Sequence, residues 1–181
     1  SAWTHPLAPD DVSGHCTASQ QWTKTIVYTG ENKINWPRFT VDNNGTKHLI
    51  HYDNATDFLF YTTNFNGGWS TTAVGNVGYG GSNASLQTAP DGTVHATFLD
   101  FKKGWLRYVT NADGEWRYGV VDDSKFVGWF SSLVYRHDGT RIVTYRSAPD
   151  SAVRIAVCKT QCTTNDSGLT GWSHFTVDED G

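Results

Sequence analysis

Nearly the same text occurs twice in this chain. "NGTKHLIHYDNATDFLFYTTNFNGGW" begins at Asn44, and "DGTVHATFLDFKKGWLRYVTNADGEW" begins at Asp91. A third turn of the same kind, Asp-Gly-Thr, begins at Asp138. Self-similarity at a fixed period of about 47 residues is the signature of a repeat protein, in which each unit adopts the same local structure. This spacing limits the possible folds more than any other feature of the sequence.

Each repeat reads as four short strands. In the second repeat we expect strands at 83–88, 93–99, 104–110 and 115–121, because alternating β-branched and aromatic residues favour strands that pack on both faces. Asp-Gly and Asn-Ala-Asp-Gly between the first and last pairs supply the positive φ of tight turns. The sequence therefore predicts an all-β fold of four-stranded antiparallel blades of the β-propeller type, in about three and a half repeats. A β-sandwich, which short strands also fit, is the alternative.

The repeats also predict the organisation of the chain. Residues 1–29 are expected to hold an N-terminal segment with the last hairpin of a partial blade. Residues 30–181 are expected to form three blades, at approximately 33–77, 78–124 and 125–178. Propellers usually need roughly 4–8 blades to close. We therefore expect the chain either to associate with itself or to belong to a longer protein.

Charge and cysteine content narrow the setting in which the protein works. The formal net charge is -4 and no run of Lys or Arg occurs, which argues against a nucleic-acid partner. No apolar stretch has the length of about 18–20 residues that a membrane-spanning helix needs. Cys16, Cys158 and Cys162 lack the spacing of a zinc site, which favours a disulfide in an extracellular protein. A Cys158–Cys162 bond would close a local loop, whereas Cys16–Cys158 would join the two ends of the chain.

Several segments resemble the propeller repeats of secreted bacterial proteins. The matching text is "DGTVHATFLD", "AVCKTQC", "GWSHFTVD" and, in part, "HCTASQQWTKTIVYT". The resemblance spans about residues 15 to 178 and rests on structural motifs. It implies a secreted β-propeller, from a group whose functions include carbohydrate recognition, adhesion and polysaccharide degradation. It transfers no catalytic residue to this chain.

The expected topology separates the frame from a candidate site. In a four-stranded meander, the loops between the second and third strands and the connections between blades lie on one face, here called the loop face. Its residues differ between repeats, and functional residues concentrate in such variable loops. Aromatic rings stack on the C–H face of sugars, and planar polar groups bind the hydroxyls. The candidate ligand-binding residues are Trp36, Asp53, Tyr79, Asp100, Trp129 and Arg146.

The chemistry of the site is less constrained. His48 and His95 repeat in register, which favours a structural role over catalysis, and the catalytic residues, if any, are unknown. No cofactor or metal is expected, although the loop that begins at Asp42 weakly resembles a calcium loop. We therefore expect a non-catalytic extracellular module that binds a glycan or another surface ligand. The alternatives are a polysaccharide-degrading lyase or glycoside hydrolase, for which a His–Tyr–Arg or two-carboxylate cluster in one cleft would argue, and a protein-docking propeller.

Overall fold

The structure is a computed structural model that describes residues 24–29, 34–76, 80–163 and 171–178. These residues form three four-stranded antiparallel sheets and contain no helix. Each sheet is a meander of four consecutive strands. Sheet 1 consists of β1 (Ile34–Val41), β2 (Lys47–Asp53), β3 (Phe58–Thr63) and β4 (Ser70–Asn76). Sheet 2 consists of β5 (Gly80–Thr88), β6 (Val94–Asp100), β7 (Trp105–Thr110) and β8 (Arg117–Asp122). Sheet 3 consists of β9 (Val127–Tyr135), β10 (Arg141–Ser147), β11 (Val153–Cys158) and β12 (Ser173–Asp178).

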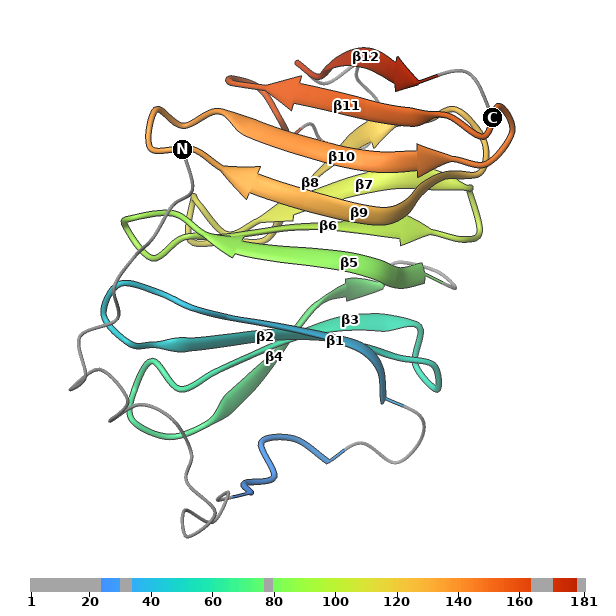
Figure 1. The fold of residues 1–181 in the computed structure, drawn as a ribbon. Helices are drawn as coiled ribbons and strands as arrows, with labels where there is room; N and C mark the ends of the chain where they lie inside the picture. Colours follow the sequence, from blue (N-terminus) through green and yellow to red (C-terminus); the bar gives the residue numbers. More distant parts are fainter. Residues whose placement is uncertain (1–23, 30–33, 77–79, 164–170, 179–181) are drawn as a thin grey trace, which may run out of the picture.

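The three sheets follow one another as a stack (Figure 1). Their first strands are neighbours, because β1 contacts β5 and β5 contacts β9. The all-β prediction is confirmed, and the strands of the second repeat lie within a few residues of the predicted ranges. Three separate sheets replace the two that a sandwich would have. The described sheets do not close into a ring, so the propeller stays a prediction.

Repeated turns explain the repeated text. Gly45, Gly92 and Gly139 follow the first strand of each sheet with φ of 80°, 85° and 81°, values that glycine adopts at little steric cost. Asp42 Oδ1 accepts hydrogen bonds from the backbone N–H groups of Asn44 (2.9 Å) and Thr46 (2.8 Å). The loop with a weak resemblance to a calcium site thus forms the turn between β1 and β2.

A second repeated feature is a kink in the first strand of each sheet. Trp36, Asn83 and Phe130 have positive φ (57°, 52° and 53°) and lie at equivalent positions of the repeat. The pairing register shifts at each of them, which marks a β-bulge. None of the three is glycine, so their local sequence does not predict this conformation.

Two apolar cores hold the stack together. One lies between sheets 1 and 2 and includes Ile50, Leu59 and Phe98; the other lies between sheets 2 and 3 and includes Leu106 and Val143. Sheet 2 is covered on both faces, and every residue of β6 is buried. At roughly 25 cal/mol per Å² of apolar surface removed from water, burial in these cores is the main stabilising contribution to the stack.

Aromatic and polar groups also connect neighbouring sheets at repeated positions. The Trp116 ring meets the edge of Tyr61 in sheet 1 with centroids 5.3 Å apart, and Trp172 meets Tyr108 of sheet 2 at 5.5 Å. Trp116 and Trp172, which hold equivalent positions of the repeat, therefore both lie between sheets. No helix in the described residues is long and apolar enough to cross a membrane.

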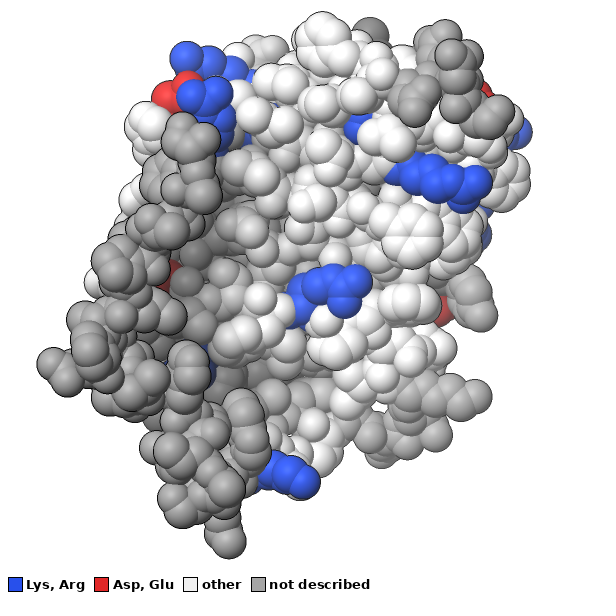
Figure 2. All heavy atoms as spheres, in the orientation of Figure 1, with Lys and Arg blue, Asp and Glu red and all other residues white. Residues whose placement is uncertain are grey.

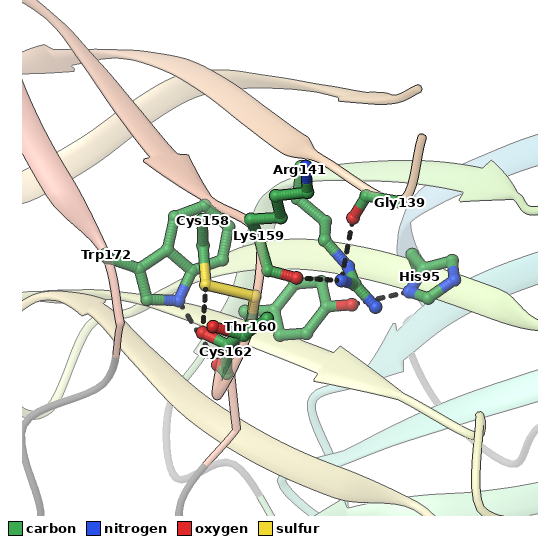
Figure 3. The surroundings of a disulfide bond; sticks show 9 residues. His95, Gly139, Arg141, Cys158, Lys159, Thr160, Cys162 and Trp172 are labelled. Carbon is green, nitrogen blue, oxygen red and sulfur yellow. Dashed lines mark hydrogen bonds between the residues drawn. A yellow bond between two sulfur atoms is a disulfide. The ribbon is translucent and has the colours of Figure 1, made fainter. Parts of the chain in front are cut away.

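The predicted disulfide joins Cys158 to Cys162, whose Cα atoms lie 5.8 Å apart (Figure 3). Trp172 Nε1 donates a hydrogen bond of 3.2 Å to the carbonyl oxygen of Cys162, so the bridge also positions the tryptophan. Cys16, the partner in the alternative pairing, lies outside the described residues. So does most of the predicted partial blade, of which residues 24–29 form no strand.

Candidate functional site

Two of the predicted ligand-binding residues hold turns on the loop face. Asp53 and Asp100 are 4% and 3% exposed. Asp53 Oδ1 accepts a hydrogen bond from Ala55 N (2.7 Å), and Asp100 Oδ1 accepts one from Lys103 N (3.1 Å). Arg107 Nη1 lies 3.5 Å from Asp100 Oδ2. Both carboxylates thus stabilise the turn that follows the second strand of their sheet, and little of either reaches the surface.

The other predicted residues are distributed over the stack. Trp36 is 45% exposed on β1 of sheet 1. Trp129 on β9 pairs with Arg146 on β10, both in sheet 3, and Arg146 is exposed. Tyr79 lies outside the described residues. The structure therefore brings Trp129 and Arg146 together and places Trp36 two sheets away.

Trp129 belongs to an aromatic cluster that consists of Phe101, Trp129 and Phe130. The rings of Phe101 and Trp129 meet edge to face with centroids 5.2 Å apart, and Phe130 lies 6.5 Å from Trp129. Phe101 and Phe130 are 37% and 73% exposed. The Trp129 indole nitrogen is buried without a hydrogen-bond partner among the described residues. The cluster presents aromatic faces to solvent beside the turn between β6 and β7.

Phe126 extends this aromatic surface along the connection from β8 to β9. It is 59% exposed and has a φ of 61°. Its carbonyl oxygen accepts a hydrogen bond of 3.1 Å from Ala148 N. A Cβ on Gly104 would lie 2.8 Å from its backbone nitrogen, so the glycine permits this close approach. The neighbouring turns therefore fix the backbone of Phe126 while its side chain remains accessible.

A polar pocket lies at the start of the same connection. Its volume is about 230 Å³, and its lining residues come from the end of β8, from β11 and from β12. They are Asp122, Asp123, Ser124, Arg154, His174, Phe175 and Thr176. The connection from β8 to β9 thus begins at this pocket and ends at the aromatic surface.

Arg154 organises the charges of the polar pocket. Its Nη1 lies 3.2 Å from Asp122 Oδ2, and its Nη2 lies 2.5 Å from Asp150 Oδ2. Tyr145 donates a hydrogen bond of 2.6 Å to Asp122 Oδ2. Two carboxylates therefore already neutralise the guanidinium, which leaves the pocket better suited to a neutral hydroxylated ligand than to an anion.

The protonation states follow from these contacts. Burial acts to raise the pKa of Asp122, but hydrogen bonds from Tyr145 and Ser124 outweigh it, and the pKa is lowered. Burial and the adjacent Asp122 raise the pKa of Tyr145. His174 Nε2 contacts the carbonyl oxygen of Val121, which only accepts, so this nitrogen carries a proton. At neutral pH the pocket is therefore lined by an ionised Asp122, which accepts a hydrogen bond from the protonated hydroxyl of the buried Tyr145.

Sequence reasoning missed this pocket because its members are far apart in the chain. Asp122 and Arg154 come from different sheets, and His174 follows Tyr118, its counterpart in sheet 2, by 56 residues, nine more than the repeat, because the third repeat carries an insertion. The repeat could have indicated this pocket, because it aligns the residues of sheet 3 with their counterparts in sheet 2. Arg107 and Tyr118 occupy the positions in sheet 2 that Arg154 and His174 occupy in sheet 3, and Tyr118 donates a hydrogen bond to Val74 O (2.6 Å) as His174 does to Val121 O.

The repeated histidines lie away from the loop face, inside the sheets. His48 Nδ1 lies 2.6 Å from the Tyr61 hydroxyl, and His95 Nδ1 lies 2.5 Å from that of Tyr108. Both histidines are buried. Burial, reinforced by the positive charge of Arg141, lowers the pKa of His95 to about 4. His95 is therefore a neutral interior group, and the burial and hydrogen bond of both histidines agree with a structural role.

Metal ligands, surface charge and similarity to known proteins give little further information on the function. Within the described ranges, no group of three or more His, Cys, Asp and Glu side chains is arranged to hold a metal ion. The visible face in Figure 2 is largely uncharged, and its Lys and Arg side chains stand apart from one another. No protein-family model matches the chain, and no curated protein matches it.

Proposed function

We propose that the protein is an extracellular, non-catalytic carbohydrate-binding module of the β-propeller type. The stacked four-stranded sheets, with their first strands as neighbours, support the propeller arrangement. The resemblance to repeats of secreted bacterial proteins and the Cys158–Cys162 bond support an extracellular location. The ligand would be a glycan on a surface or a soluble polysaccharide.

The aromatic surface on the loop face carries this proposal. Phe101, Phe126 and Phe130 expose ring faces on which the C–H face of a sugar can stack. The connection from β8 to β9 leads from these rings to the polar pocket, where Asp122, Ser124 and Arg154 offer acceptors and donors for hydroxyl groups. Aromatic faces beside fixed polar groups are the combination that sugar binding requires.

A glycan array followed by titration calorimetry tests the proposal. Phe101→Ala and Phe126→Ala each remove one exposed ring and should weaken binding of an array hit by about tenfold. Phe65→Ala removes a ring that is 73% exposed on the turn between β3 and β4, and should leave the affinity unchanged. Absence of any array hit, or equal affinity in all three variants, would contradict the proposal.

The polar pocket favours one second candidate, a polysaccharide-degrading enzyme. Its lining brings Asp122, Arg154 and His174 together, and the buried Tyr145 hydrogen-bonds Asp122 from behind the pocket, which is the kind of cluster that such chemistry uses. The pKa shifts argue against acid–base roles for two of them, because the raised pKa makes Tyr145 a poorer acid and the lowered pKa makes Asp122 a weaker base. Release of new chain ends from a polysaccharide that disappears in His174→Ala would favour the enzyme over the binding module.

A further inference from the structure

The two outer faces of the stack carry apolar residues at the same repeat positions that are buried on the inner faces. Between sheets 1 and 2, Leu59 and Leu86 belong to one core; between sheets 2 and 3, Leu106 and Leu133 belong to the other. All four are at most 5% exposed. Leu59 and Leu106 are equivalent positions of the repeat, and so are Leu86 and Leu133. Each interface therefore pairs the same two positions from successive sheets.

The next members of both series are exposed at opposite ends of the stack (Figure 1). Val153 follows Leu59 and Leu106 in the series and is 45% exposed on sheet 3. Phe39 precedes Leu86 and Leu133 and is 57% exposed on sheet 1. Val177, the counterpart of the buried Val121, is 59% exposed beside Val153 on sheet 3. Each end of the stack thus exposes apolar positions of an interface that the molecule already forms twice. On sheet 1 the ring of Tyr28 covers another part of this face, where it stacks on His51 and Phe60.

We propose that these two faces bind each other between two copies of the chain. The outer face of sheet 3 in one copy, with Val153 and Val177, packs against the outer face of sheet 1 in the other, with Phe39. A two-fold axis relates two such contacts, each between unlike faces. Two copies then form a closed ring with twice the three sheets of one copy, within the range of roughly 4–8 blades at which propellers close.

Continuity with the internal interfaces identifies a second copy as the occupant. Both halves of the contact are made of the same repeat, and their apolar residues match those of the two cores in position. Two charged residues occupy core positions on these faces: Lys47, the counterpart of the buried Val94, and Arg146, the counterpart of Tyr52 and Leu99. Each has a long side chain that can reach solvent past a packed neighbour.

The experiment is the mass of the full chain in solution, by light scattering over a wide range of concentration. We expect the mass of two chains. Val153→Asp and Phe39→Asp should each weaken the dimer by about a hundredfold or more, because either change puts a charge into both contacts. Phe65→Asp, at a position that is 73% exposed on the turn between β3 and β4, should leave the dimer intact. Circular dichroism verifies that each variant folds. If an aspartate variant does not fold, Val153→Ser or Phe39→Ser is used in its place.

Two outcomes would overturn the proposal. A wild-type chain that is monomeric at every concentration would mean that something other than a second copy covers these faces. A dimer that survives either Val153→Asp or Phe39→Asp would mean that like faces pair, since a contact between unlike faces depends on both residues. Neither outcome bears on carbohydrate binding by the loop face, which the calorimetry tests separately.

Discussion

His95 makes the stability of the fold sensitive to acid. It is 1% exposed on β6, and burial lowers its pKa from 6.5 to about 4. In the unfolded chain the imidazole returns to its ordinary pKa and binds a proton more readily. As the pH falls from 6.5 towards 4, the unfolded chain takes up a proton that the folded protein does not, so the free energy of unfolding decreases in this window.

The size of the effect follows from the two pKa values. Between about pH 7.5 and about pH 4.5, the contribution of His95 to the free energy of unfolding falls by roughly 2.5 kcal/mol. His95→Gln keeps a side chain that can hydrogen-bond the Tyr108 hydroxyl and does not titrate in this range. The variant should therefore lose less stability than the wild type over the same interval, by roughly that amount.

Denaturant titrations of both proteins at the two pH values measure this difference directly. His51 and the carboxylates that do not interact with His95 contribute equally to both proteins and cancel in the comparison; Asp91, whose pKa His95 helps to lower, does not cancel fully. His137→Gln, which removes an exposed imidazole from the turn between β9 and β10, should behave as the wild type. Equal losses in the wild type and His95→Gln would refute the reasoning, because they would mean that folding does not keep His95 neutral.

Two further predictions concern contacts within and between the sheets. Reduction of Cys158–Cys162, or replacement of both cysteines by serine, should lower the free energy of unfolding by about 2 kcal/mol, because this is the loop-closure value for so short a loop. Denaturant titration with and without reductant measures the change. An unchanged free energy of unfolding would mean that the loop is held without the bridge. Tyr118→Phe removes the hydrogen bond to Val74 O and should cost about 1 kcal/mol in the same assay, whereas an unchanged midpoint would show that solvent replaces this bond without loss.

The repeat was sufficient to predict the strands but not the bulges. Alternating side chains and Asp-Gly turns are local signals, and they located β6 and its turn correctly because tertiary packing agrees with them. Trp36, Asn83 and Phe130 share a positive φ with no glycine among them. At Asn83 the bulge coincides with contacts between neighbouring sheets, because Asn83 Oδ1 accepts a hydrogen bond from Phe130 N and Asn83 O accepts one from the Ser131 hydroxyl. The pattern within one repeat does not contain these contacts.

The candidate site was harder to predict for a related reason. Asp53 and Asp100 were chosen as polar groups beside loops, yet their oxygens bind turn amides, which is the commonest use of Asp at such a position. The polar pocket depends on an ion pair between Arg154 of sheet 3 and Asp122 of the neighbouring sheet 2. That contact depends on how the sheets stack, which the pattern within one repeat does not specify.

Each sheet is made from one uninterrupted stretch of chain, and this has a consequence for synthesis of the protein. The four strands of a sheet pair only with their neighbours in sequence, so hairpins can form as soon as their residues leave the ribosome. A lone sheet buries neither of its faces and gains stability only when the next sheet packs on it. We therefore expect the growing chain to become stable in steps, the first when sheet 2 packs on sheet 1 and the second when sheet 3 covers the other face of sheet 2.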